Sequence, residues 1–210
     1  MKELKYLENI LNSLLSPNQE SLKLSMCDVH HKGLFSLVVS GKEHGNLLRV
    51  FIANEKLKPY EVQFHTHRYP IKLTTIKGSI THHLASEVNY VNSKVVTLSE
   101  FDYTSPLNDG KGLVYLKETG VVIDNFSIPN GSNIFISSNE FHTISCSKGA
   151  IWIVKELGFQ SKSSKVLGIP FVLDGLYNKP EMFQINDNVQ KVIREITSIV
   201  NCYKLIEKRT

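Results

Sequence analysis

The central part of the chain consists of short runs of β-branched and aromatic residues, each ended by turn-forming residues. About ten such runs follow one another, and no helical periodicity lies between them. Turn signals such as Thr119-Gly120 and Asn130-Gly131 separate the runs. The expected strands cover residues 34–39, 47–53, 61–67, 72–84, 88–101, 114–117, 121–126, 133–137, 141–146 and 151–157. Strands of this length and spacing predict an antiparallel sandwich or barrel.

An amphipathic helix is expected on each side of this β-rich core. Apolar residues recur at three- and four-residue steps near both ends of the chain, and Pro17 follows the first of these patterns. Each helix then covers an apolar surface, either of the core or of a partner chain, so a homodimer is one expectation. A single domain, 1–210, is expected, with an N-terminal helix, a β-barrel core, an irregular crossing segment and a C-terminal helix at residues 1–18, 33–157, 158–186 and 187–207.

Composition and charge narrow the function classes. No run of about 18 apolar residues is present and the N-terminus lacks a signal-peptide pattern, so no membrane partner is expected. Three cysteines, an odd number without a CxxC pair, predict reduced thiols and a cytoplasmic location. The 24 basic and 20 acidic residues leave a formal charge of +4, and the basic residues are scattered rather than clustered. No nucleic-acid partner is therefore expected.

The sharpest chemical signal is the segment Gln63-Phe64-His65-Thr66-His67. Successive side chains of a strand alternate between its two faces, so Gln63, His65 and His67 share one face. Two imidazoles spaced in this way can point their ring nitrogens at one ion. Alone, the pair fits either a metal site or two surface histidines that hydrogen-bond to their neighbours.

Two glycines and a third histidine extend this pattern. Gly78 lies eleven residues after His67, and His142 lies eleven residues after the turn residue Gly131. This layout resembles the cupin superfamily, whose two motifs have the forms G(x)5HxH(x)3–4E(x)6G and G(x)5PxG(x)2H(x)3N. The resemblance covers roughly residues 45–157 and implies an all-β core, the antiparallel double-stranded β-helix or cupin/jelly-roll barrel.

The resemblance implies that His65, His67 and His142 bind a divalent metal. Lys72 stands where the first cupin motif has glutamate, so the implied ligands are three neutral imidazoles without a carboxylate. This set resembles that of the thiol dioxygenases and of uncharacterised bacterial cupin-like proteins, which implies Fe(II), with Ni, Mn or Zn as alternatives. In thiol dioxygenases with a cysteine at the glutamate position, that cysteine is crosslinked to a tyrosine. A lysine cannot form this crosslink, so neither the crosslink nor a cysteine substrate is carried over.

Three further side chains are candidates for substrate binding. If the strand after Pro70 keeps the cupin register, Lys72 and Thr74 point into the barrel, near the metal and Gln63. A buried ammonium group needs an anion beside it, so Lys72 would pair with an anionic group of the substrate. Alternatively, Lys72 turns outward or pairs with a protein carboxylate such as Glu140 or Glu156.

His82 and His83 occupy opposite faces of one expected strand, so only one of them faces the interior. The register favours His82, which would donate a hydrogen bond behind the metal ligands or shuttle a proton. His82 is therefore, with Lys72, a candidate for a catalytic role, and a purely structural histidine is the alternative. The remaining histidines, His30, His31 and His44, are expected in solvated loops.

Three functions follow from the resemblance. The first is a mononuclear non-haem Fe(II) dioxygenase or oxygenase that acts on a small polar or anionic substrate bound at the three-histidine metal. The second is an isomerase or lyase that uses Zn, Ni or Mn as a Lewis acid. The third is a non-catalytic module that binds a small molecule in the barrel. In each case the expected partner is a small molecule.

Overall fold

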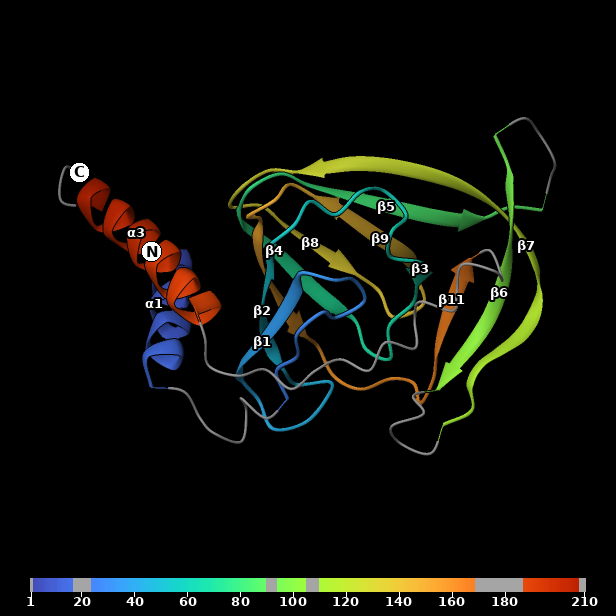
Figure 1. Ribbon diagram of the computed structural model, residues 1–210, viewed down its shortest axis with the longest axis horizontal. Coiled ribbons are helices and arrows are strands. Elements are labelled where there is room, and N and C mark those ends of the chain that lie inside the picture. The colour runs from blue at the N-terminus through green and yellow to red at the C-terminus, as the bar shows by residue number, and fades with distance from the viewer. Residues whose placement is uncertain (1, 17–23, 90–93, 105–109, 169–186, 208–210) are drawn as a thin grey trace.

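The computed structural model describes residues 2–16, 24–89, 94–104, 110–168 and 187–207, and it shows a helix pair, an open sheet and a closed barrel (Figure 1). The helices are α1 (Lys2–Leu15) and α3 (Asp187–Glu207). The five-stranded sheet has the order β1 (Leu34–Ser40), β2 (Leu48–Ala53), β10 (Ile151–Glu156), β4 (Ile71–Lys77) and β8 (Asn133–Ile136). The barrel has the order β11 (Ser164–Gly168), β3 (Phe64–His65), β9 (Phe141–Cys146), β5 (Ile80–Glu87), β7 (Gly112–Ile128) and β6 (Val96–Thr104). All pairings in both are antiparallel, which confirms the expected all-β core of the cupin/jelly-roll type with two helices.

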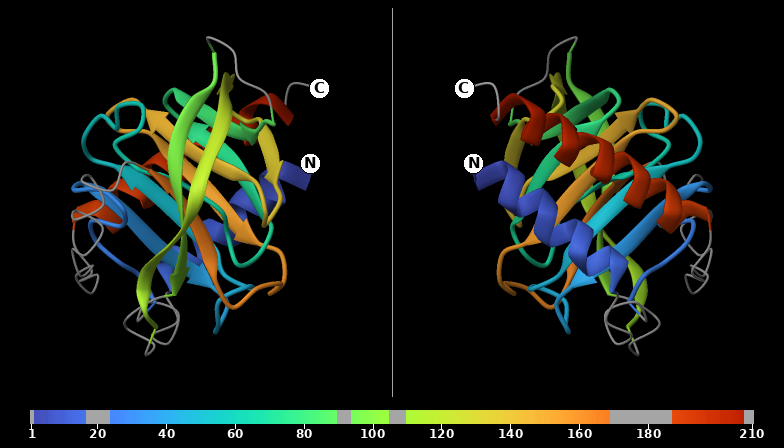
Figure 2. Two further views of the ribbon diagram at one scale, coloured as in Figure 1. Left: turned by 90° about the vertical axis from the view of Figure 1, so that its right-hand side faces the viewer. Right: turned by 90° about the vertical axis from the view of Figure 1, so that its left-hand side faces the viewer.

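The two helices lie side by side across the outer face of the five-stranded sheet, as Figure 2 shows. Their apolar stripes, which include Leu7, Ile10 and Ile196, pack on outward-facing sheet residues such as Val50 and Ile153. The contact follows from the sequence, since both helices carry one apolar face and alternate residues of β2 and β10 are apolar. Among the described residues, no helix is both long and apolar enough to cross a membrane.

A second apolar cluster fills the space between the sheet and the barrel. Leu73 and Trp152 come from the sheet, and Ile80, Ile128 and Cys146 come from the barrel. Because side chains alternate along each strand, the residues of β5 and β9 that share a face with Ile80 and Cys146 also point into this space. This inner face carries the candidate site.

The chain passes from the sheet to the barrel at Gly78, between β4 and β5. Gly78 has φ +89°, and a Cβ built on it would lie 2.8 Å from Ala150 Cα. Both the backbone conformation and the close approach therefore require glycine here. The run expected as one strand over 72–84 is thus divided at Gly78 into β4 and β5.

Several boundaries differ from those expected. Thr119-Gly120 is not a turn, because both residues lie inside the continuous strand β7 and pair with β6. Part of the segment expected to be irregular forms β11, which joins β3 to β6 and closes the barrel. The remainder of that segment, residues 169–186, lies outside the described residues.

Candidate metal centre

Three histidines meet on the inner face of the barrel. His65 lies on β3 directly opposite His142 of β9, and His67 follows β3 by two residues. Phe64, before His65, and Thr66, between His65 and His67, are buried on the other side of the segment, so the alternation expected from sequence is present. One potential ligand nitrogen from each of His65, His67 and His142 lies within 4.8 Å of the others.

The rings are oriented so that their ligand nitrogens converge. His67 Nε2 lies 2.7 Å from His142 Nε2. His65 Nδ1 lies 2.9 Å from the carbonyl oxygen of Gln63, to which a protonated Nδ1 donates a hydrogen bond. That bond leaves the lone pair of His65 on Nε2, which is the tautomer that binds a metal through Nε2.

All three imidazoles are held in the neutral form that a metal requires. Burial lowers the pKa of His65, with the Gln63 carbonyl opposing this effect. Burial and the neighbouring imidazoles hold the pKa values of His67 and His142 well below their usual range. At neutral pH each ring therefore offers a lone pair and carries no charge.

The three residues fit a divalent transition metal. An ion held about 2 Å from each of three imidazole nitrogens draws those nitrogens to within roughly 3–4 Å of one another, close to the separations observed here. Imidazole is a suitable ligand for iron, nickel and zinc. Within the described part of the chain, no carboxylate or thiolate joins this group.

Aromatic side chains surround the centre. His30 stacks on His65, with ring centroids 5.3 Å apart, and Tyr69 stacks on His67 at 6.2 Å. His82 lies beside His142 at 5.0 Å, and its ring meets the Phe126 ring edge-on. Rings on several sides thus limit the movement of the candidate ligands and restrict water around them.

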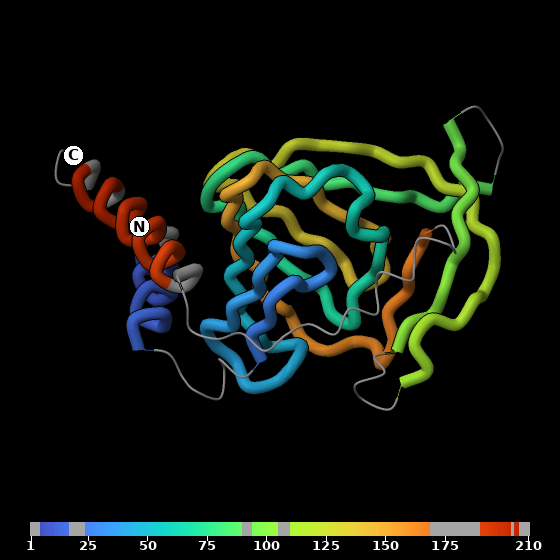
Figure 3. The backbone as a smooth tube through the Cα atoms, viewed as in Figure 1, coloured from blue at the N-terminus to red at the C-terminus, as the bar shows by residue number. Residues whose placement is uncertain are grey.

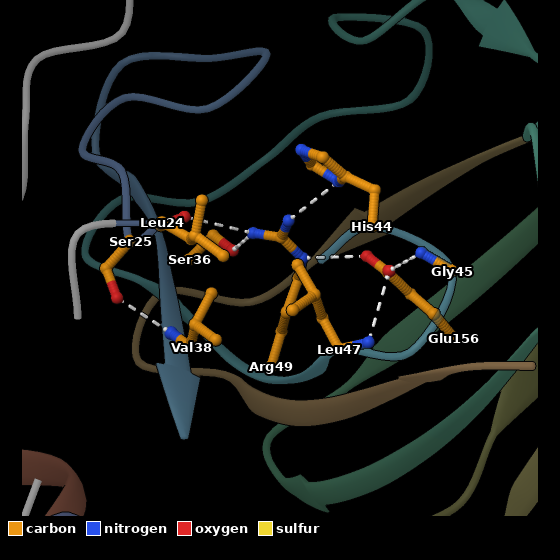
Figure 4. Close-up of polar contacts among 9 residues, drawn as sticks. All are labelled: Leu24, Ser25, Ser36, Val38, His44, Gly45, Leu47, Arg49 and Glu156. Carbon is orange, nitrogen blue, oxygen red and sulfur yellow. Dashed lines mark hydrogen bonds and ion pairs between the residues drawn. The ribbon is translucent and has the colours of Figure 1, made fainter. Parts of the chain in front are cut away.

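Tyr69 connects this centre to a buried ion pair. Its hydroxyl donates a hydrogen bond to Glu156, and burial followed by the charge of Glu156 raises the pKa of Tyr69. Glu156 accepts a 3.0 Å bond from Arg49 Nε and further bonds from the backbone amides of Gly45 and Leu47 (Figure 4). The Arg49 guanidinium also approaches Ser36, Leu24 and His44 (Figure 4).

The three residues expected to bind substrate, Gln63, Lys72 and Thr74, do not lie together in the structure. Gln63 lies next to the centre and orients His65 through its backbone carbonyl. Lys72 is exposed and Thr74 lies on the same outer face of β4, opposite to the side expected. Lys72 pairs in register with Phe135, which is 62% exposed.

The expectation for Lys72 and Thr74 is wrong because β4 buries the other set of alternating residues. Ile71 and Leu73 point into the core between the sheet and the barrel, which puts Lys72 and Thr74 outside. A change of one residue moves every side chain of a strand to the other face. Of the alternatives for Lys72, the outward position is the one observed. Glu156 is paired with Arg49 instead.

Two of the three histidines expected in solvated loops, His30 and His44, lie close to the metal centre. His30 has φ 63° and stacks on His65, and His44 contacts Arg49 and stacks on Tyr69 at 6.5 Å. His31, by contrast, pairs with the half-exposed Glu61. The sequence offers no periodic signal for His30, His44 or Tyr69, because irregular segments bring them to the site.

No protein-family model matches the chain, and no curated protein matches it. Among solved structures, it is similar to hydroxypropylphosphonic acid epoxidase from S. wedmorenis, with 10% identity and a TM-score of 0.40 over 66% of this chain and 57% of the epoxidase. It is also similar to hydroquinone 1,2-dioxygenase from Sphingomonas sp. TTNP3, with 11% identity and a TM-score of 0.36 over 60% of this chain and 65% of that one. A cupin-like protein from Thermotoga maritima matches with 7% identity and a TM-score of 0.30 over 74% and 80% of the two chains. The chain thus spans less than two thirds of the length of the first two proteins.

The fold and the site together define a class of protein. The core consists of an antiparallel sheet and an antiparallel barrel, consistent with a cupin/jelly-roll fold, and its inner face carries a cluster of three histidines suited to a divalent metal. The ligand positions agree with those implied by the cupin motifs, at His65, His67 and His142. The reaction is a separate question, because one fold supports many chemistries.

Proposed function

We propose that the protein is a mononuclear non-haem Fe(II) oxygenase that acts on a small polar or anionic molecule. The observation that carries the proposal is the convergence of three neutral imidazoles, without a carboxylate, within the described residues. A ligand set without charge leaves the full charge of a divalent ion to attract an anionic donor group. Three protein ligands also leave coordination positions for the substrate and dioxygen.

The chain's own residues prepare the site in several ways. His65, His67 and His142 would hold the metal, and bound Fe(II) would supply a redox-active Lewis acid at which the substrate and dioxygen react. The Gln63 carbonyl fixes the tautomer of His65, and Tyr69 covers one face of His67. Because Lys72 points outward, attraction of an anionic substrate would depend on the metal rather than on this side chain.

Metal analysis of the full chain, purified without chelator, tests the proposal. We expect close to one iron per chain in the wild type and loss of nearly all of it in a His65→Ala/His142→Ala double variant. His31→Ala is a matched control, because His31 lies outside the cluster and should leave the metal content unchanged. The iron-loaded wild type should then consume oxygen with members of a panel of small acids and thiols.

Each other outcome selects against the proposal. A different bound metal, lost in the double variant, would favour a Lewis-acid isomerase or lyase. Absence of metal from the wild type, even after addition of Fe(II) without oxygen, would leave a non-catalytic barrel that binds a small molecule. Stoichiometric iron without oxygen uptake on the whole panel would contradict the small-acid and thiol substrate class.

A further inference from the structure

His82 is a buried imidazole on the same inner face as the candidate ligands. It lies on β5 opposite Ile144 of β9, while His142 lies opposite Leu84. His82 and His142 are therefore diagonal neighbours on one face of two paired strands, where ring side chains come into contact. Only 1% of His82 and 4% of His142 is exposed.

Three ring nitrogens of this pair have no hydrogen-bond partner in the part of the chain that the structure describes. They are Nδ1 and Nε2 of His82 and Nδ1 of His142. Buried polar atoms without partners are uncommon and costly, and they call for a physical explanation. The neighbouring His83 shows the usual situation: it is 3% exposed, and its ring nitrogens meet Asn125 and Ser145.

Metal binding creates a demand that His82 can meet. An imidazole that binds a metal through Nε2 carries its proton on Nδ1, and this N–H needs an acceptor. For His65 the acceptor is the Gln63 carbonyl, whereas Nδ1 of His142 has none among the described groups. His82 is the adjacent polar ring, and a neutral imidazole has one lone pair to offer.

The distance between the rings suits such a bond. His67 and His142, whose Nε2 atoms lie 2.7 Å apart, have ring centroids 4.9 Å apart and an interplanar angle of 43°. His82 and His142 have almost the same arrangement, with centroids 5.0 Å apart and an angle of 46°. A centroid separation of 5.0 Å therefore leaves room for a hydrogen bond between ring nitrogens of His82 and His142.

We propose that His82 is a positioning residue of the metal centre, which accepts a hydrogen bond from Nδ1 of His142 and so keeps Nε2 of His142 available for the metal. This inference rests on the proposed metal site, although it does not depend on the identity of the metal or the substrate. It explains why three ring nitrogens without partners, two of His82 and one of His142, are buried side by side. The Phe126 ring, edge-on to His82 at 4.8 Å, keeps the imidazole close to His142.

The test compares His82→Phe with the wild type in two measurements. Zn(II) affinity, measured by competition with a chromophoric chelator, should fall about 10- to 100-fold, as expected for loss of an outer partner of a metal ligand. The urea midpoint of the metal-free protein should stay the same or rise, because phenylalanine removes two buried polar atoms that have no partner. A residue with only a structural role would show the opposite pattern.

Two further variants sharpen the test. His82→Asn and His82→Gln each retain a carbonyl acceptor, at positions close to Nδ1 and Nε2 respectively, and at least one should restore Zn(II) affinity to within about threefold of the wild type. His83→Phe is the matched control on the same strand. It should lower the urea midpoint, because it removes the hydrogen bonds of the buried ring to Asn125 and Ser145, while Zn(II) affinity stays unchanged.

The possible failures are distinguishable. Wild-type protein that binds no Zn(II) or Fe(II) would overturn the proposed function itself. Wild-type affinity in His82→Phe, with the metal still bound by the three histidines, would overturn only the role of His82. The same conclusion would follow if His82→Phe were destabilised as much as His83→Phe or failed to fold.

Discussion

Two buried carboxylates, Glu156 and Glu100, are each neutralised by side chains from other strands. Glu156 of β10 meets Arg49 of β2 between the sheet and the barrel, and the ion pair reaches Tyr69 and the metal centre. Glu100 of β6 accepts a 2.6 Å bond from Lys165 of β11 and a 2.9 Å bond from Thr119 of β7. Such pairs fix which strands lie together, and removal of one partner is costly because the other is left without compensation.

Glu100 should make the stability of the protein depend on pH. Burial alone would raise the pKa of its carboxyl, but hydrogen bonds from Lys165 and Thr119 and the charges of Lys165 and Lys117 outweigh burial, and the net pKa is lowered. A lowered pKa in the folded state stabilises the protein above the unfolded-state value of about 4.3, and this contribution is lost as pH falls through the folded-state value. Glu100→Gln should therefore lower the urea midpoint at pH 7 but flatten its decline below about pH 5.

Urea midpoints of the wild type and Glu100→Gln between pH 3 and pH 7 provide the measurement. Glu55→Gln is the control, because the Glu55–Lys148 pair is largely exposed and should contribute little at any pH. Equal slopes for the wild type and Glu100→Gln would show that Glu100 does not carry the pH dependence.

Individual elements follow the sequence closely where local chemistry is decisive. Strand β9 has the predicted bounds, and α3 (Asp187–Glu207) covers the segment in which the C-terminal helix was expected. Strand β7 is different, because Gly120 has the local signal of a turn but lies in an extended strand paired with Thr97 of β6. Local propensity is a weak guide where a neighbouring strand supplies the hydrogen bonds.

Gly78 and Gly131 separate two contributions to the cost of a side chain at a turn. Both have positive φ, at +89° and +79°, but a Cβ on Gly131 meets nothing within 4 Å whereas one on Gly78 collides with Ala150. Gly131→Ala should cost only the backbone strain, about 1–3 kcal/mol. Gly78→Ala should cost about 1–3 kcal/mol more, because the β4–β5 junction must also move.

The free energies of unfolding of these two variants, from urea titrations, decide the matter. The m-value should stay constant, which would show that the denatured state is unaffected. Equal losses in Gly78→Ala and Gly131→Ala would indicate that the close approach to Ala150 is relieved at no cost.

At the scale of the whole molecule, the helices and the metal centre occupy different sides of the five-stranded sheet. Figure 3 follows the backbone from the helix pair at one end, through the sheet, to β6 and β7 at the other. From the sequence, the apolar faces of α1 and α3 were expected to pack either on the core of the same chain or on a partner chain. The sheet of the same chain covers them. A homodimer and a cytoplasmic location stay predictions, to be checked by the mass of the protein in solution and by fractionation of cells.

Because the helices and the metal centre lie on different sides of the sheet, a substitution in the helix contact should lower stability without changing metal binding. Ile196→Ala on α3 should lower the free energy of unfolding by about 2–5 kcal/mol, because Ile196 is fully buried between the helices and the sheet. Leu205→Ala on the same helix is the control; Leu205 is 59% exposed, so its loss should change stability by about 0.5 kcal/mol or less. The metal content of both folded variants should equal that of the wild type. Loss of metal from folded Ile196→Ala would show that the helix side and the metal centre are coupled.

The sequence by itself determined the class of the fold and the three converging histidines. Alternating apolar residues and turn signals are local, so they predict strands, and the HxH spacing places His65 and His67 on one face wherever that segment packs. His142 joined them through its spacing from Gly131, a pattern that depends on the resemblance to cupins.

Only the tertiary structure decided which face of β4 is buried, how the barrel closes through β11, and which other rings reach the centre. Lys72 points inward or outward according to which alternating residues of β4 fill the core. Ile71 and Leu73 fill it because they pack against strands that are distant in the sequence. His30, Tyr69 and the Arg49–Glu156 pair reach the site through loops and long-range contacts that leave no period in the sequence. The unpartnered nitrogens of His82 and His142 are likewise visible only once both side chains are buried together.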